Sequence, residues 1–346
     1  MKRIGYVFDE VISLENLRSA HFEAKKSRKP KRRFKAIVYE MNLERNLQRL
    51  HDELEAGTWR MHPYSEMMRR ERGKLRDIFY SKFHEDSIVQ HAITRTVGKK
   101  LNKTLIRDTF ASIKGRGTHD GLKRLRDYVF SLPPDVRCYV YKSDIRKCYP
   151  SIKHEPLKAR MSDQIKDRRM LWLFDVIIDS HEPGIPIGNP ISPLLANVLL
   201  SELDHTAKEI FRIKGYFRNL DDIVAIRTGD DCKERLKEFA LYVKSYLAQL
   251  GLEIKPNEQV YPIERGGVDF LGYVVKRYCV RLRVKTERRF RRKARKFKEN
   301  PTEKNLESMS SYWGLVKWLS KGRRLWLSLL PKTIHKLRSK NHDETC

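Results

Sequence analysis

The pair Asp221-Asp222 constrains the fold of this chain more than any other feature, because it stands between two runs with the composition of β-strands. Residues 216–220 and 223–226 are mostly aromatic or aliphatic, and only the two acidic residues separate them. Strands joined by so short a link pair with each other, so we expect a hairpin with both carboxylates at its tip. An Asp-Asp pair without such flanks is more typical of a solvated turn or a helix start.

A third carboxylate, Asp144, lies in a similar setting within the strand-like run 139–145. Acidic residues on neighbouring strands can hold two divalent ions about 4 Å apart, which together activate a 3′-hydroxyl and neutralise a departing pyrophosphate. Carboxylate oxygens suit Mg²⁺. Metal hydrolases also use paired carboxylates, so the spacing alone leaves the reaction open. No cluster of histidines accompanies the acids, which disfavours a zinc or phosphatase-like binuclear site.

The charge of the chain indicates its partner. A formal net charge of +29 over 346 residues, with a pI near 9.9, attracts polyanions, of which nucleic acid is the commonest. A ribosomal-type or architectural binder has a similar charge. The 40% hydrophobic and 10% aromatic residues are enough to bury a substantial core, so the cations coat a globular protein. Together these features predict a metal-dependent enzyme that acts on nucleic acid.

The cysteines and the hydropathy pattern indicate the compartment. The five cysteines are odd in number and lack the paired spacing of a metal site, as in reduced intracellular proteins. No N-terminal apolar run resembles a signal peptide, and no run approaches the length of a membrane span. We therefore expect an intracellular, cytoplasmic protein with no membrane partner.

Two segments concentrate the cations. Residues 24–35 carry eight cations and a proline, which predicts a loop that contacts phosphates or is merely solvated. Residues 285–298 carry nine cations and one acid, with Phe290 and Phe297 one heptad apart. This pattern predicts a helix that packs its aromatic rings inward and offers phosphate-binding charge outward. A surface helix without a ligand is the alternative, but so many like charges would repel one another.

Hydrophobic periodicity divides the chain into three sections. We expect helices over 39–56, 87–97 and 121–132 in the first section, and a basic helical section at the end. In between, we expect strands over 139–145, 216–226, 259–263 and 268–276, and helices over 193–210 and 233–250. Strands that gather carboxylates and are backed by helices predict an α+β, palm-like layer.

Five short motifs, in a fixed order, resemble those of bacterial reverse transcriptases. They are Asp144-Ile-Arg-Lys-Cys-Tyr149, Gly184-Ile-Pro-Ile-Gly188 with Ser192-Pro193, Asn219-Leu-Asp221-Asp222, Leu250-Gly-Leu-Glu-Ile-Lys255 and Phe270-Leu-Gly-Tyr273. Upstream, Lys74-Leu-Arg76 and Gly117-Thr-His119 resemble the fingers region of the same enzymes. The likeness covers about residues 60 to 320. It is greatest to the compact enzymes of diversity-generating retroelements, which share a short thumb with tryptophans, here residues 313–318.

This resemblance implies an α+β, right-hand polymerase fold with fingers, a palm that contains an antiparallel sheet, and a helical thumb. The expected parts are a basic N-terminal segment over 1–39, fingers over 40–135, a palm over 136–277, a thumb over 278–330 and a C-terminal tail over 331–346. The implied activity is RNA-directed DNA synthesis with two Mg²⁺ ions, or Mn²⁺ in their place.

The resemblance also implies roles for the matched residues. The catalytic residues would be Asp144, Asp221 and Asp222, which would bind the metal ions together with Ile145. The nucleotide-binding residues would be Lys74, Arg76, Tyr149, Gly188 and Lys255. Within this set, Lys74 and Arg76 would hold the triphosphate, and Tyr149 would lie under the sugar and exclude a 2′-hydroxyl.

A second implied set contacts nucleic acid. It comprises Ser192 in the template-facing loop, Asn219 at the hairpin tip, the primer grip Phe270, Leu271, Gly272 and Tyr273, and the basic helix residues Arg288, Arg289, Arg292, Arg295 and Lys296. The expected partners are a template or non-coding RNA and the cDNA product, with an accessory protein or a second copy of the chain as further candidates.

Two departures from the family pattern bear on the biological role. Asn219 stands where the family usually has a tyrosine, whose ring would pack beneath the primer terminus. Pro193 follows Ser192, as in group II intron and many defence-associated enzymes, whereas diversity-generating members usually have glutamine there. We therefore expect an enzyme that copies a dedicated non-coding RNA in a bacterial or phage system, for antiphage defence or diversification. An RNA-binding scaffold with a vestigial polymerase site is the alternative, although the retained carboxylates argue against decay.

Overall fold

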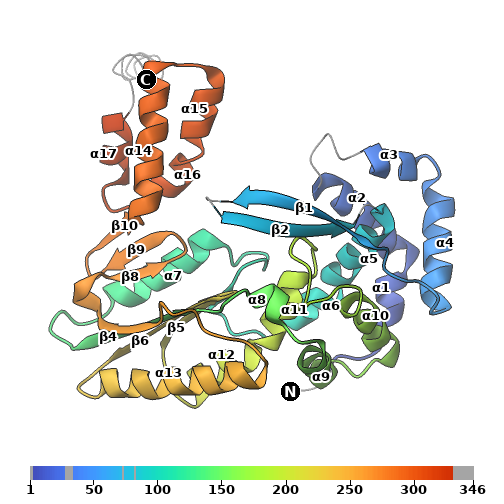
Figure 1. Cartoon of the computed structure of the whole chain (residues 1–346), viewed down its shortest axis with the longest axis horizontal. Helices are drawn as coiled ribbons and strands as arrows, with labels where there is room; N and C mark the ends of the chain where they lie inside the picture. Colours follow the sequence, from blue (N-terminus) through green and yellow to red (C-terminus); the bar gives the residue numbers. More distant parts are fainter. Residues whose placement is uncertain (1–2, 28–33, 72–73, 82, 330–346) are drawn as a thin grey trace, which may run out of the picture. The chain divides into compact units, whose positions relative to one another are not determined.

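The computed structural model describes residues 3–27, 34–71, 74–81 and 83–329 (Figure 1). Its helices are α1 (Phe8–Ile12), α2 (Leu14–Ser27), α3 (Phe34–Glu40), α4 (Leu43–Glu55), α5 (His84–Arg95), α6 (Val97–Asn102), α7 (Thr118–Phe130), α8 (Cys148–Ser151), α9 (His154–Gln164), α10 (Arg168–Ile178), α11 (Ser192–Leu199), α12 (Ser201–Glu209), α13 (Cys232–Gln249), α14 (Val284–Glu299), α15 (Glu303–Ser310), α16 (Trp313–Val316) and α17 (Gly322–Leu329). Its strands are β1 (Tyr64–Glu71), β2 (Lys74–Ser81), β3 (Thr109–Phe110), β4 (Cys138–Asp144), β5 (Gly215–Asn219), β6 (Asp222–Thr228), β7 (Gln259–Pro262), β8 (Val268–Phe270), β9 (Tyr273–Lys276) and β10 (Cys279–Leu282). No helix within these ranges is long and apolar enough to cross a bilayer. Much of the basic segment 24–35 and the whole of the expected tail 331–346 lie outside the described residues.

A five-stranded sheet carries the acidic residues, with its strands in the order β3-β5-β6-β4-β7. β5 and β6 form the hairpin that the sequence predicts, and residues 223–226 are buried, as expected for strands in the middle of a sheet. β4 pairs antiparallel with β7. The sheet is not wholly antiparallel, because Thr109 and Phe110 of β3 pair in parallel with Arg218 and Asn219 of β5. A strand of two residues has no alternation that a sequence can reveal.

The chain divides into two compact units. The first holds residues up to 114, 143–223 and 238–258, and the second holds the remaining described residues. The predicted limits of fingers, palm and thumb follow a different division, and they stay predictions.

In the first unit, α2 packs along α5, and β1 pairs antiparallel with β2. The helix predicted over 87–97 is confirmed as α5, which buries Ile88, Val89 and Ile93. The helix predicted over 39–56 corresponds mainly to α4. It ends just before Gly57, as expected, and the φ of +68° at Gly57 is the left-handed conformation that terminates many helices.

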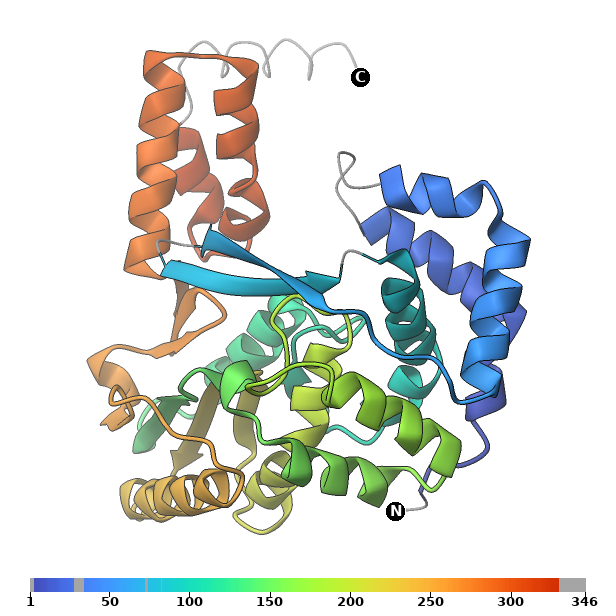
Figure 2. The same ribbon diagram turned by 45° about the vertical axis from the view of Figure 1, so that its right-hand side comes forward.

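In the second unit, the basic helix α14 packs against α15 and α17 (Figure 2). The ring of Phe290 is fully buried and stacks on Trp326, with ring centroids 5.7 Å apart, and on Tyr312, with centroids 5.3 Å apart. Phe297 is also buried, so the predicted inward face of this helix is confirmed.

The second unit also contains a three-stranded sheet of β10, β9 and β8. The single strand predicted over 268–276 is in fact two antiparallel strands, β8 and β9. The chain reverses at Leu271 and Gly272, whose φ angles are +54° and +88°. The prediction was wrong because a leucine in the left-handed region leaves no signal in the pattern of apolar residues.

The described cysteines are free thiols, as expected. Cys138, Cys148 and Cys232 are buried, and Cys279 is half-buried, whereas Cys346 lies outside the described residues. Burial raises the pKa of Cys138 and Cys148 to about 12, so both thiols stay protonated at neutral pH.

Candidate active site

Two carboxylates from neighbouring strands meet at one end of the central sheet. Asp144 ends β4, and Asp221 lies in the short turn between β5 and β6. The ammonium group of Lys255 contacts both, with its Nζ 3.3 Å from Asp144 Oδ1 and 3.6 Å from Asp221 Oδ2. The structure therefore brings together three of the predicted site residues from separate parts of the sequence.

Backbone hydrogen bonds fix these segments to one another. The Ile145 N–H donates to the Asp221 carbonyl at 2.9 Å, and the Lys255 N–H donates to the Asp144 carbonyl at 2.8 Å. Leu220, just before Asp221, has a φ of +55°, which is uncommon for a residue with a side chain. The turn that presents Asp221 is therefore tight, and it is held from the neighbouring strand.

Asn257 is a site residue that the sequence analysis did not identify. Its side-chain Nδ2 donates to Asp144 Oδ2 at 3.1 Å, while Lys255 contacts the other oxygen of the same carboxylate. Nothing in the local sequence separates Asn257 from an ordinary turn-forming asparagine, because Pro256 precedes it.

The donor set fits a divalent cation. Asp144 and Asp221 offer hard carboxylate oxygens, and both already face one positive charge, the Lys255 ammonium. Within the described ranges, no group of three or more His, Cys, Asp or Glu side chains is arranged to hold a metal ion. The place of half-buried Asp222 in the metal site therefore stays a prediction. Ile145 is fully buried and apolar, so only its backbone could serve as a ligand.

Glycines hold the loop before α11 against two other elements. Gly184 has a φ of +68°, and a Cβ there would collide with the carbonyl of Tyr149 in α8. Gly188 has a φ of +119°, and a Cβ there would lie 2.9 Å from the Phe79 carbonyl oxygen in β2. The Phe79 N–H also donates to the Ile187 carbonyl at 2.9 Å. Only glycine permits such close backbone contact, so the loop is tied at both ends.

The other residues predicted near the nucleotide have different degrees of exposure. Tyr149 is half-buried in α8, and Asn219 is half-buried at the end of β5. Ser192 is buried, and its hydroxyl donates to the Pro186 carbonyl at 2.8 Å. Ser192 therefore shapes the loop from inside and does not present its hydroxyl to a nucleic acid.

The predicted triphosphate ligands lie on β2. Lys74 begins this strand, and Arg76 lies opposite Arg69 of β1 in the antiparallel register. Their side chains lie outside the described part of the structure, so their contacts with a triphosphate stay a prediction.

In the second unit, the predicted primer grip forms the turn between β8 and β9. Phe270 and Tyr273 are fully buried, and the Tyr273 hydroxyl donates to the Leu315 carbonyl at 3.3 Å. Burial prevents these two rings from touching a nucleic acid directly, which limits them to supporting the turn. Leu271 and Gly272 are half-buried and form its accessible part.

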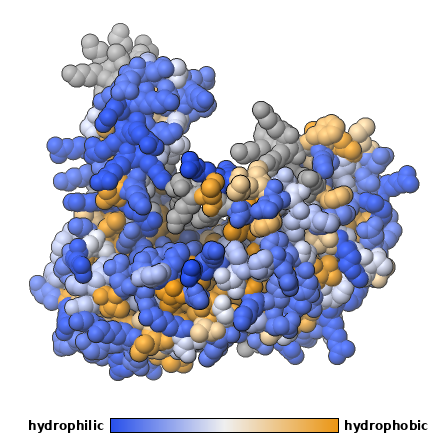
Figure 3. Space-filling view, viewed as in Figure 1, coloured by the Kyte–Doolittle hydropathy of each residue, from blue (hydrophilic) through white to orange (hydrophobic). Residues whose placement is uncertain are grey.

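The basic face of α14 is exposed, as predicted. Hydrophilic side chains cover this helix in the space-filling view (Figure 3). The exposed cations of the predicted set are Arg288, Arg292, Arg295 and Lys296, and Arg289 is half-buried.

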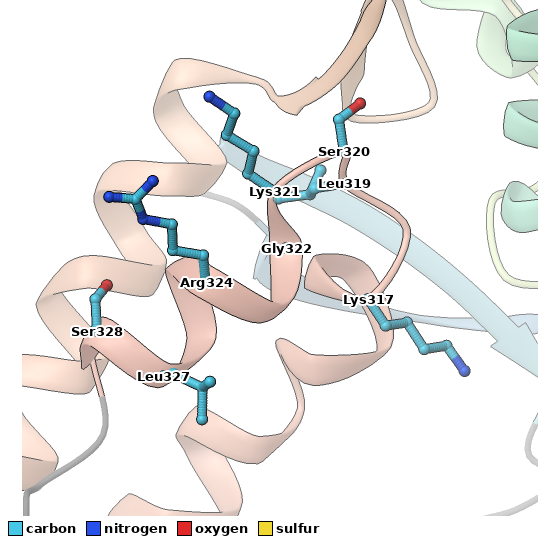
Figure 4. A pocket seen from close by; sticks show the side chains of 8 residues that line it. All are labelled: Lys317, Leu319, Ser320, Lys321, Gly322, Arg324, Leu327 and Ser328. Atoms are coloured by element: carbon cyan, nitrogen blue, oxygen red, sulfur yellow. The ribbon is translucent and has the colours of Figure 1, made fainter.

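A pocket of about 860 Å³ lies beside α17 and adds further cations to the second unit. Lys317, Lys321 and Arg324 are among its lining residues (Figure 4). Lys317 points away from the other two, so the three charges do not converge on one point.

The chain resembles several known proteins over part of their length. It is 24% identical to the putative COX1/OXI3 intron 2 protein of Saccharomyces cerevisiae, covering 39% of this chain and 23% of that protein. It is 28% identical to the retron Ec73 reverse transcriptase of Escherichia coli, covering 36% of this chain and 43% of that protein. The chain thus spans less than half the length of these curated relatives. A solved structure of telomerase from Candida tropicalis, in complex with a TWJ fragment of telomeric RNA, matches with a TM-score of 0.49 and 11% identity, covering 75% of this chain and 55% of that one.

A family model matches more than half of the chain. The model described as reverse transcriptase (RNA-dependent DNA polymerase) matches residues 84–275 of the 346. The matched segment contains Asp144, Asp221, Asp222 and Lys255, and it includes the whole five-stranded sheet. The predicted fold class, an α+β right-hand polymerase fold, is therefore confirmed, and the chain belongs to the reverse transcriptase family.

Proposed function

We propose that this chain is a magnesium-dependent, RNA-directed DNA polymerase. The observation that carries the proposal is the meeting of Asp144 and Asp221, from adjacent strands, around one positive charge. Membership of the reverse transcriptase family supports the same reaction. The test is extension of a DNA primer on an RNA template by the purified protein with dNTPs and Mg²⁺. Tight RNA binding without any extension would favour the alternative, a scaffold with a vestigial site.

In the proposed reaction, Asp144 and Asp221 hold the metal ions, with Asp222 and the backbone of Ile145 beside them. When bound, Mg²⁺ supplies a Lewis acid for the 3′-hydroxyl and neutralises the charge of the pyrophosphate. In the structure, the Lys255 ammonium group supplies a counter-charge to both carboxylates. Bound metal ions would take over that counter-charge, and the ammonium group of Lys255 would then be free to bind a nucleotide phosphate, its predicted role.

The fingers and the loop of residues 184–188 supply the rest of the proposed nucleotide site. Lys74 and Arg76 of β2 bind the triphosphate, and Gly188 keeps the loop close to that strand. The proposed limits of fingers, palm and thumb are residues 40–135, 136–277 and 278–330. The thumb then offers the α14 cations to the phosphates of the template and the growing strand.

Replacing Tyr149 with alanine is expected to weaken discrimination against ribonucleotides by roughly 10- to 100-fold, because the ring would no longer exclude a 2′-hydroxyl by its shape. The measurement is kcat/KM for single additions of rNTP and dNTP on one primer and template. Tyr149→Phe keeps the ring and is the matched control. Unchanged discrimination in Tyr149→Ala would place the sugar gate elsewhere.

We further propose that the template is one dedicated non-coding RNA of a bacterial or phage system, serving defence or diversification. Phosphate contacts alone carry no sequence information, so selectivity must come from the shape of the RNA, its loops or an accessory protein. Sequencing the RNA and cDNA that copurify with the protein is expected to show a single transcript encoded beside the gene. A random cellular mixture would contradict a dedicated template. Adenine-specific changes entering a nearby gene would indicate diversification, and short or repetitive DNA that accumulates on phage infection would indicate defence.

A further inference from the structure

A fully buried ion pair lies behind the turn that presents Asp221. Arg218 of β5 and Asp204 of α12 both have side chains with 0% exposure. They form two parallel hydrogen bonds, from Arg218 Nε to Asp204 Oδ1 and from NH2 to Oδ2, each 2.6 Å long. Such a paired geometry is the strongest form of an arginine–carboxylate contact.

Further hydrogen bonds saturate the Asp204 carboxylate. The Tyr216 hydroxyl donates to Oδ1 at 2.7 Å, and the Thr109 hydroxyl donates to Oδ2 at 2.7 Å. Burial alone would lower the pKa of Arg218, but the Asp204 carboxylate outweighs burial and raises it. The pair therefore stays ionised, and its orientation is fixed from β3, β5 and α12 together.

The remaining nitrogen of the guanidinium faces the catalytic turn. Arg218 NH1 donates to the Leu220 carbonyl at 3.2 Å and to Asn197 Oδ1 at 3.2 Å. The Leu220 carbonyl belongs to the peptide that joins Leu220 to Asp221. The next carbonyl, that of Asp221, accepts from the Ile145 N–H. Both peptide groups that flank the Asp221 side chain are thus held, one by Arg218 and one by β4.

We propose that Arg218 and Asp204 are positioning residues, a buried clamp that fixes the Leu220–Asp221 peptide and so the place of the Asp221 carboxylate beside Asp144. A purely structural ion pair would stabilise the sheet without bonding to the turn. The bond from NH1 to Leu220, a residue with φ of +55°, is the observation that distinguishes the two roles.

Two variants distinguish an effect on the position of the Asp221 carboxylate from an effect on the stability of the fold. Arg218→Lys keeps the charge but replaces a planar fork of donors with one ammonium, which cannot serve both Asp204 and the turn. Arg218→Met with Asp204→Asn removes both buried charges; of the hydroxyls of Tyr216 and Thr109, one can still donate to the amide oxygen and the other can accept from the amide NH2. The matched control is Lys208→Met with Asp108→Asn, which removes a partly buried pair at 2.9 Å and keeps the backbone bond from the Arg218 N–H to the Asp108 carbonyl.

Three measurements on the full chain test the clamp. The first is hydrogen exchange of the Ile145 amide, whose acceptor is the Asp221 carbonyl; both clamp variants are expected to exchange about tenfold faster. The second is titration with Mn²⁺ alone, whose Kd is expected to rise about 10- to 100-fold, as for other losses of ligand support. The third is nucleotide addition, for which kcat is expected to fall by a similar factor with little change in KM.

The inference rests on the proposed polymerase function only for the third measurement. If the clamp variants match the control in Ile145 exchange and Mn²⁺ affinity, the ion pair is merely structural and the clamp is wrong. Should the double variant fail to fold, Arg218→Lys decides the question by the same readouts. Wild-type protein that never adds nucleotides would refute the proposed function, whereas the exchange and Mn²⁺ results would still decide the clamp.

Discussion

Changing Asp144 or Asp221 to asparagine is expected to lower the rate of nucleotide addition by at least about three orders of magnitude. The variants lose a charged metal ligand, and three orders of magnitude correspond to about 4 kcal/mol of transition-state stabilisation, within the several kcal/mol that metal ions supply. RNA affinity should change by less than about twofold, because the cations that attract RNA are untouched. The measurements are single-turnover primer extension and RNA binding at equal salt.

Asp163→Asn, at an exposed position of α9, provides a control for the loss of one acidic charge. Thermal unfolding of all three variants should stay close to that of the wild type, since asparagine is nearly isosteric with aspartate. Extension of a primer by the purified Asp144→Asn, Asp221→Asn double variant would end the assignment of the polymerase site.

Reversing two exposed charges of α14, Arg292→Glu with Arg295→Glu, is expected to weaken RNA binding by roughly twentyfold or more near 0.15 M salt. Each lost phosphate contact removes about 0.7 to 0.9 from the slope of log affinity against log salt, so the slope should fall by about 1.5. The measurement is a salt series of binding constants with one structured RNA. The core of this helix faces the other way, through Phe290 and Phe297, so the fold should be kept.

A matched reversal on α13, Arg235→Glu with Lys237→Glu, also lies at exposed positions and changes the net charge by the same amount. It should leave the slope almost unchanged if RNA contacts α14 specifically. Equal losses in both variants would mean that RNA responds to the overall charge of +29 and not to this helix.

The strands of the active site could be predicted because their signals are local. Asp144 and Asp221 each stand beside a short apolar run rich in β-branched and aromatic residues, which is typical of a buried strand. Lys255 was predicted from a motif as a nucleotide ligand; the structure places it against both carboxylates, and its role toward the nucleotide stays a prediction. The inward rings of α14 followed from spacing alone.

The supporting residues could not be predicted because their partners are distant in the sequence. Arg218 and Asp204 are 14 residues apart on different elements, and an arginine within a strand does not reveal which carboxylate will bury with it. Asn257 reaches Asp144 across 113 residues. The hairpin of β1 and β2 escaped prediction for another reason: charged residues are distributed along both strands, so no apolar alternation marks it.

The loop of residues 184–188, before α11, connects the proposed triphosphate site to the proposed sugar site. β2 carries Lys74 and Arg76, which are proposed to bind the triphosphate, and α8 carries Tyr149, which is proposed to test the sugar. The five residues from Gly184 to Gly188 span these elements, with backbone contact at each end and no room for a side chain. A shift of β2 toward a nucleotide would therefore pull on α8 through a short tether. Binding of the phosphates and exclusion of a ribose 2′-hydroxyl would then depend on one movement of β2.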